Sequence, residues 1–403
     1  MWSVSLRLFG LVAVVAALSG CFRLGRGMGY EAPPPRPEAL ERYYKADGGY
    51  SSFVSTIAEE RSKYTHHHII VQTGSGPIIL DYFASKKVAP DMVFVFPVLG
   101  GKNVIEKHIA EYMAQHGVDA AIVNRSNEFK DPTKFDDLEE IFRKNVIRDR
   151  LAIDFFEREY GKKNFGTIGI SRGGINVAVT AGVDPRLKYN VIALGGTDMV
   201  NLFHDSNQKR IQKYINSVRD NKKITEKEFY SELKENVRTD PKYTAHFMDA
   251  KNSLLILAIF DKTVPFSYGL KLREDMGYPK TVFLMADHFT GLLFTQTVSL
   301  VPPRLGPGLF PFPYIEQEAL TFFRSKFKRG YNWGMLPYRI FQFPVNVVAE
   351  VANGIGSGIG WLFRSHATPV IGDNGEKFWA AAIEAGDLKR ASPVISTFLP
   401  MKP

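Results

Sequence analysis

The stretch GISRG, residues 169–173, decides the fold of this chain. It has the pattern Gly-x-Ser-x-Gly; an apolar, β-prone run (165–170) leads into it and a helix-compatible run (175–181) follows it. A sharp turn from a strand into a helix places the serine in strained backbone geometry and exposes its hydroxyl at the top of a sheet. The flanking glycines suit such a turn because they carry no side chain. The stretch therefore predicts a nucleophilic serine at Ser171 rather than a plain Gly-rich turn.

A serine nucleophile needs a base and an acid that orients the base, and residues of both types follow in the chain. The run 253–260 has a buried-strand pattern and ends at Asp261, while His288 follows the next short apolar run, 281–285. Ligands of open α/β sheets bind outside the carboxyl ends of the strands, where these loops lie. The order Ser, Asp, His predicts that Ser171, Asp261 and His288 meet.

Two further carboxylates leave questions open. Asp198 follows another apolar run, 191–196, and is an alternative to Asp261 as the orienting acid. Asp287 directly precedes His288 and places a second carboxylate beside the predicted base.

Residues 65–328, about two-thirds of the chain, resemble an α/β-hydrolase through the GISRG turn, the Asp-x-x-Val-Pro turn at Asp261 and the His-Phe-Thr turn at His288. The resemblance implies a mostly parallel central sheet flanked by helices, with a helical cap and a C-terminal extension. It also implies that Ser171 is the nucleophile, His288 the general base and then acid, and Asp261 the orienting acid. Many relatives have glycine at the position of Asp287.

Acyl transfer by such a site needs two backbone N–H groups for the oxyanion. One is expected from Arg172, the residue after the nucleophile, and the other from the loop after an earlier strand, 92–96. That loop reads PVLGG (97–101), and Leu99 is the candidate for the second donor. Many relatives have His-Gly where this chain has Pro97-Val98.

No metal or cofactor is predicted. The three adjacent histidines at 66–68 fall on an extended run, where neighbouring side chains point to opposite faces and do not converge on one ion. His108 and His116 share a helical pattern but have no third ligand nearby. The sequence contains no zinc, calcium or P-loop motif.

The amino terminus has the features of an export signal. A short region with one cation, Arg7, precedes an apolar run that ends at Leu18-Ser19-Gly20-Cys21. This ending resembles the lipobox of bacterial lipoproteins, which implies that the thiol of Cys21 receives a diacylglyceryl group and that fatty acyl chains such as palmitate complete the anchor. Cys21 is the only cysteine of the chain, which fits an exported protein without disulfides.

The predicted location is therefore the bacterial cell envelope, with the protein attached to a membrane through Cys21. Phe22, not an acidic residue, follows the lipidated position, which favours an outer membrane if the organism has one. The catalytic part is expected to lie outside the cytoplasm.

Composition agrees with a folded enzyme. The chain is 45% hydrophobic and carries a formal net charge of +9 that is spread along its length. With no nucleic-acid motif and no basic cluster, nucleic-acid binding is not expected.

Runs of proline, glycine and charged residues mark the boundaries between the parts of the chain. The predicted parts are a signal peptide (1–20), a lipid-anchored N-terminus with a Pro-rich spacer (21–64), a hydrolase domain (65–328) with a cap at about 198–247 and a Pro-rich insertion at about 292–313, and an apolar, Gly-rich extension (329–403). The proline and glycine residues in the extension argue against a regular membrane-spanning helix. The extension is expected to pack on the body or, alternatively, to contact the membrane interface or an envelope protein.

The predicted activity is hydrolysis of a small or lipid-like carboxylic ester through an acyl-enzyme on Ser171. A peptidase or thioesterase that uses the same three residues is an alternative. A different class, a scaffold lipoprotein that keeps the fold but binds an envelope partner, is a third.

Overall fold

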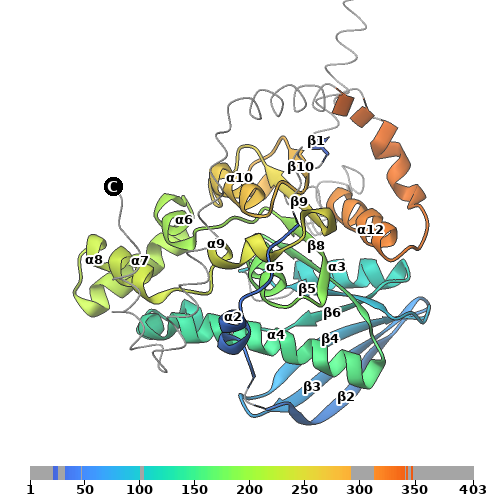
Figure 1. Cartoon of the computed structure of the whole chain (residues 1–403), viewed down its shortest axis with the longest axis horizontal. Helices are drawn as coiled ribbons and strands as arrows, with labels where there is room; N and C mark the ends of the chain where they lie inside the picture. Colours follow the sequence, from blue (N-terminus) through green and yellow to red (C-terminus); the bar gives the residue numbers. More distant parts are fainter. Residues whose placement is uncertain are drawn as a thin grey trace, which may run out of the picture.

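A ten-stranded sheet forms the centre of the protein, with helices on both faces (Figure 1). The computed structural model describes residues 21–25, 32–46, 48–99, 104–291, 313–340, 342–343 and 346–347. The strands are β1 (Cys21–Leu24), β2 (Tyr50–Glu60), β3 (Tyr64–Thr73), β4 (Ile78–Ser85), β5 (Asp91–Phe96), β6 (Asp119–Val123), β7 (Asn164–Ile170), β8 (Leu187–Ala193), β9 (Ser253–Ala258) and β10 (Lys280–Leu284). Their order in the sheet is β1-β10-β9-β8-β7-β5-β6-β4-β3-β2.

The middle of the sheet is parallel and its two edges are antiparallel. Strands β10, β9, β8, β7, β5 and β6 run parallel, whereas β1 at one edge and β4, β3 and β2 at the other pair antiparallel. Strands β5, β6 and β9 are buried along their whole length, as expected for parallel strands that are covered on both faces. The apolar runs 92–96 and 253–260, which the sequence marked as strands, correspond to β5 and β9.

Two layers of helices cover the sheet. The helices are α2 (Glu38–Tyr43), α3 (Val104–Gln115), α4 (Leu138–Tyr160), α5 (Arg172–Val183), α6 (Met199–Asp205), α7 (Lys209–Lys222), α8 (Glu226–Asn236), α9 (Pro241–Thr244), α10 (Phe266–Asp275), α11 (His288–Gly291) and α12 (Tyr314–Lys326). Helices α3 and α12 pack in one core cluster, and α4, α5 and α10 in another, with strand residues in both. The alternation of strands and helices produces this arrangement.

Helices α6, α7 and α8 form a separate group to one side of the sheet (Figure 1). Their apolar side chains, among them Leu202, Ile215 and Phe229, pack with Phe135 and Leu138 in a third core cluster. A capping box, in which the Thr225 hydroxyl accepts the Glu228 N–H and the Glu228 carboxylate accepts the Thr225 N–H, starts α8. These helices fall in the predicted cap, about 198–247.

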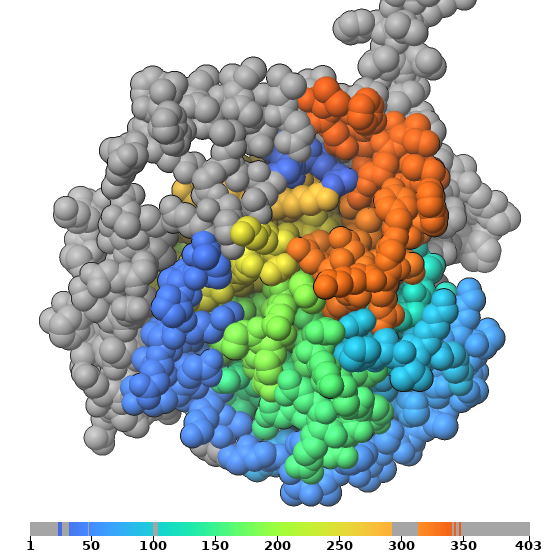
Figure 2. All heavy atoms as spheres, turned by 45° about the vertical axis from the view of Figure 1, so that its right-hand side comes forward, coloured from blue at the N-terminus to red at the C-terminus, as the bar shows by residue number. Residues whose placement is uncertain are grey.

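The amino-terminal segment differs from the expected spacer. Strand β1 extends the sheet by pairing with β10, and α2 buries Leu40 and Tyr43 against the body. The Arg36 guanidinium donates to the carbonyl oxygens of Gly182 (2.7 Å) and Ala181 (3.0 Å) at the end of α5. In Figure 2 the blue N-terminal residues accordingly lie against the green and yellow body. The segment 36–44 is therefore packed on the folded domain, because its aromatic and aliphatic side chains find buried sites there.

Strand β2 places the start of the sheet before residue 65, where the hydrolase domain was expected to begin. It pairs with β3 along its length, and most of its residues are exposed. The signal peptide (1–20), nearly all of the Pro-rich insertion and most of the 329–403 extension lie outside the described residues. Within the described residues, no helix is both long and apolar enough to cross a membrane.

The chain has an α/β-hydrolase fold with a helical cap. The evidence is the mostly parallel sheet, the helices on both of its faces and the strand-turn-helix connection of β7, Ser171 and α5. The predicted fold class is confirmed.

Candidate active site

Ser171 occupies the turn between β7 and α5 with φ 56° and ψ −122°. Residues other than glycine rarely adopt this backbone conformation. The turn closes because two glycines flank it. A Cβ on Gly169 would lie 2.2 Å from the Gly173 carbonyl oxygen, and a Cβ on Gly173 would lie 2.3 Å from the carbonyl oxygen of Phe96 in β5. Only glycine fits these two positions, so the motif holds the serine at the carboxyl end of the sheet.

Three side chains form a continuous chain of hydrogen bonds. His288 Nε2 lies 2.9 Å from Ser171 Oγ, and His288 Nδ1 lies 2.6 Å from Asp261 Oδ2. The side chains of His288 and Asp261 are both buried. With the Nδ1 proton donated to the Asp261 carboxylate, Nε2 has a lone pair that accepts the Ser171 hydroxyl proton. The structure thus brings together the serine, acid and histidine that the sequence singled out.

The Asp-x-x-Val-Pro turn explains how Asp261 is held. Its Oδ1 accepts the backbone N–H groups of Thr263 (2.8 Å) and Val264 (2.9 Å), while its other oxygen is left for His288. Both oxygens of the buried carboxylate therefore have donors, as buried polar groups require.

Asp287 has a structural role in the turn that carries His288. Its Oδ1 accepts the N–H groups of Phe289 and Thr290 and the Thr290 hydroxyl, and so caps the short helix α11. The hydrogen bonds from Thr290 lower the pKa of Asp287. This carboxylate stabilises the loop that carries His288, and it accepts its hydrogen bonds from residues of that loop.

The carboxylate of Asp198, the alternative acid, forms its hydrogen bonds with residues other than His288. Its carboxylate accepts from Lys271 (2.9 Å), Asn201 (2.9 Å) and Lys242 (3.4 Å). The carboxylate that contacts the His288 ring is that of Asp261.

The expected oxyanion donors lie beside Ser171. Arg172 is the first residue of α5, where backbone N–H groups have no acceptor within the helix. Leu99 lines the same cavity as Ser171 and Arg172. The neighbouring N–H of Val98 donates to the Glu106 carboxylate, so it is already paired.

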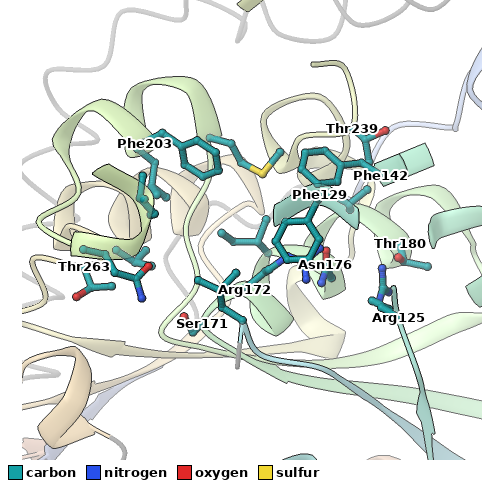
Figure 3. A pocket seen from close by; sticks show the side chains of 18 of the residues that line it. Arg125, Phe129, Phe142, Ser171, Arg172, Asn176, Thr180, Phe203, Thr239 and Thr263 are labelled. Atoms are coloured by element: carbon teal, nitrogen blue, oxygen red, sulfur yellow. The ribbon is translucent and has the colours of Figure 1, made fainter. Parts of the chain in front are cut away.

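A cavity opens beside Ser171 (Figure 3). Met199, Leu202 and Phe203 of α6 and Ile211 of α7 contribute to its wall. The cap expected from the sequence therefore does shape the space next to the serine, and its inner residues are apolar.

The opposite wall was not anticipated from the sequence. Phe129, in the short 3-10 helix η1 (Glu128–Lys130), and Phe142 in α4 line this cavity and a second hollow that shares several of its lining residues. The signal visible in the sequence was phenylalanine at intervals in the mostly polar stretch 126–145.

The histidines at 66–68 do not gather around an ion. His66 and His68 both contact Asp81, whereas His67 stacks on Tyr82. No group of three or more His, Cys, Asp or Glu side chains in the described part of the chain is arranged to hold a metal.

Comparisons with known proteins give fold neighbours only. No family model matches the chain, and no curated protein sequence matches it. Among solved structures, acetyl xylan esterase 1 from Thermoanaerobacterium sp. JW/SL YS485 is 15% identical, with 68% of this chain and 97% of that one aligned at a TM-score of 0.49. The acylaminoacyl peptidase of Pyrococcus horikoshii is 17% identical over 67% of this chain and 42% of that one, with a TM-score of 0.44.

The close approach at Gly173 gives a stability prediction. We expect Gly173→Ala to lower the free energy of unfolding by about 1–3 kcal/mol or more, because the new methyl group meets the Phe96 carbonyl. Urea denaturation measures this change. The matched control is Gly49→Ala, where an added Cβ has nothing within 4 Å. Equal stability of the two variants would contradict the packing described for the turn.

Proposed function

We propose that this protein is a serine hydrolase that cleaves carboxylic esters through an acyl-enzyme on Ser171. The observation that carries the proposal is the hydrogen-bonded series Ser171–His288–Asp261 at the mouth of a cavity. A serine in this setting is activated because the histidine can remove its proton as the bond to the carbonyl carbon forms.

The proposed reaction has two halves. His288 Nε2 takes the Ser171 proton while Oγ attacks the ester carbon, and the N–H groups of Leu99 and Arg172 stabilise the resulting oxyanion. His288 then gives that proton to the leaving alcohol, and the C–O bond of the ester breaks. Water, deprotonated by His288, attacks the acyl-enzyme and releases the acid and Ser171.

Asp261 acts through the histidine. Its carboxylate fixes the tautomer with the proton on Nδ1 and stabilises the imidazolium that forms during attack. The two backbone N–H groups on its other oxygen keep the carboxylate from rotating. Asp261 is therefore the orienting acid, and Asp198 belongs to a separate ion-pair cluster with Lys242 and Lys271.

The proposed location is the surface of a bacterial membrane, through lipid on Cys21. The support is the Leu18–Cys21 sequence, together with the position of Cys21 as the first residue of β1. Because β1 pairs directly with β10, a lipid on Cys21 would hold the edge of the sheet against the membrane, without a free spacer between the anchor and the domain.

The role of Asp261 gives a kinetic prediction. We expect Asp261→Asn to lower kcat for p-nitrophenyl esters by about 10⁴-fold, because the amide no longer holds the productive tautomer. Asp198→Asn is the matched control and should retain kcat within a few-fold. The measurement is steady-state kinetics. Running it on the wild type with an ester, a thioester and an anilide of the same acyl group also shows which bond the enzyme cleaves. A large loss in Asp198→Asn with none in Asp261→Asn would reverse the assignment of the acid.

Lipidation is tested by expressing the full chain in a Gram-negative host fed an alkyne analogue of palmitate. We expect the label on the wild-type protein and none on Cys21→Ser. Ser171→Ala is the control, since it excludes label held as an acyl-enzyme and should remain labelled. Label that persists in Cys21→Ser would overturn the proposed anchor.

A further inference from the structure

Three residues that line the cavity beside Ser171 each carry a nitrogen donor without an acceptor. The donors are Arg172 Nη2, Asn176 Nδ2 and Arg125 Nε, each buried and without a hydrogen-bond partner among the described residues. A buried donor left unpaired is unfavourable, because it has lost its hydrogen bond to water. Three of them on residues that line one cavity indicate a site whose acceptor arrives with the ligand.

The donors come from neighbouring parts of the catalytic end of the sheet. Arg172 and Asn176 are four residues apart on α5, which places them on the same face of the helix. Arg125 follows the end of β6 by two residues. Figure 3 shows Arg172 extending from Ser171 beneath the Phe129 ring in the direction of Asn176. The guanidinium carbon lies 3.6 Å from the centre of that ring, so stacking fixes its orientation.

One of the two arginines that line the cavity also has no counter-ion among the described residues. Arg125 forms an ion pair with Asp149, a buried carboxylate that also accepts the Thr180 hydroxyl. Arg172 has no ion pair among the described residues, and no acidic residue of the described chain lines the cavity. Burial, with the charge of Arg125 as a second cause, lowers the pKa of Arg172 to about 9, so its guanidinium is cationic at neutral pH. Arg172 is half-buried, and an anionic ligand would supply the counter-ion that its guanidinium does not have among the described residues.

The position of His288 indicates which part of the substrate enters. His288 gives its proton to the leaving alcohol, so the alcohol lies on the histidine side of Ser171. Ser171, Leu99 and Arg172 line the cavity, whereas His288 does not. The cavity therefore lies where the acyl part of the ester would be.

We propose that the acyl part carries a carboxylate of its own, so that the substrates are half-esters of dicarboxylic acids, with Arg172 and Asn176 as specificity-determining residues. This inference rests on the proposed ester hydrolysis. The substrate carboxylate would accept hydrogen bonds from the side chains of Arg172 and Asn176. Hydrolysis consumes one water, breaks the ester C–O bond, and yields the alcohol and the dicarboxylic acid.

The first test compares two substrates that differ in one charge: the mono-p-nitrophenyl ester of adipic acid and its neutral methyl p-nitrophenyl diester. We expect the wild-type kcat/KM to favour the anionic ester by about 10- to 100-fold, the range typical of charge-assisted hydrogen bonds. Arg172→Met should abolish this ratio, and Asn176→Leu should reduce it. Arg158→Met, an exposed arginine at the end of α4, is the matched control and should keep the ratio. A wild-type preference for the neutral diester, or an unchanged ratio in Arg172→Met, would overturn the inference.

The second test does not need catalysis. In the Ser171→Ala background, monomethyl adipate should raise the melting temperature and dimethyl adipate should not, and adding Arg172→Met should remove the effect. If the enzyme is active but shows neither the substrate preference nor the thermal shift, the carboxylate site is refuted and the proposed ester hydrolysis stands. A thermal shift that depends on Arg172 in a protein with no esterase activity would refute the proposed hydrolysis while retaining the anion site.

Discussion

The fold depends on one close approach, in which α5 starts directly against the end of β5. The Gly173 backbone meets the Phe96 carbonyl, and Gly169 meets the Gly173 carbonyl, at distances that exclude any side chain. This contact forces Ser171 into its left-handed conformation and directs the start of α5, with its unpaired N–H groups, at the space above the sheet. The nucleophile, the expected oxyanion donor at Arg172 and the Arg172 side chain all take their positions from this one turn.

The remaining parts of the site come from parallel strands that end at the same edge. Strands β9 and β10 pair in register, so the turn at Asp261 and the turn at His288 lie side by side beyond their carboxyl ends. Each turn is held by a carboxylate that accepts backbone N–H groups, Asp261 in the first and Asp287 in the second. Rigid loops of this kind place the three side chains with little conformational freedom, which is what proton transfer over hydrogen-bond distance requires.

Much of the fold and the three central residues could be read from the sequence, because long apolar strands and a Gly-x-Ser-x-Gly turn are local signals. The residues missed depend on tertiary packing. Strand β2 is exposed along most of its length and β1 has four residues, so neither has a clear burial pattern. The proline-rich stretch suggested a spacer, yet Arg36 and the aromatic residues of α2 find partners on the body. Arg125 and Phe129 line the cavity only because the loop after β6 folds over α5.

The central claim is that Ser171 is an activated nucleophile. It is tested most directly by treating the folded protein with a neutral fluorophosphonate and measuring its intact mass, followed by peptide mapping of the adduct. The account predicts a single adduct on Ser171 that is absent from Ser171→Ala, and slower labelling of Asp261→Asn than of wild type. A folded protein that gains no adduct, or gains one on another residue, would contradict the account and favour a binding role for this hydrolase fold.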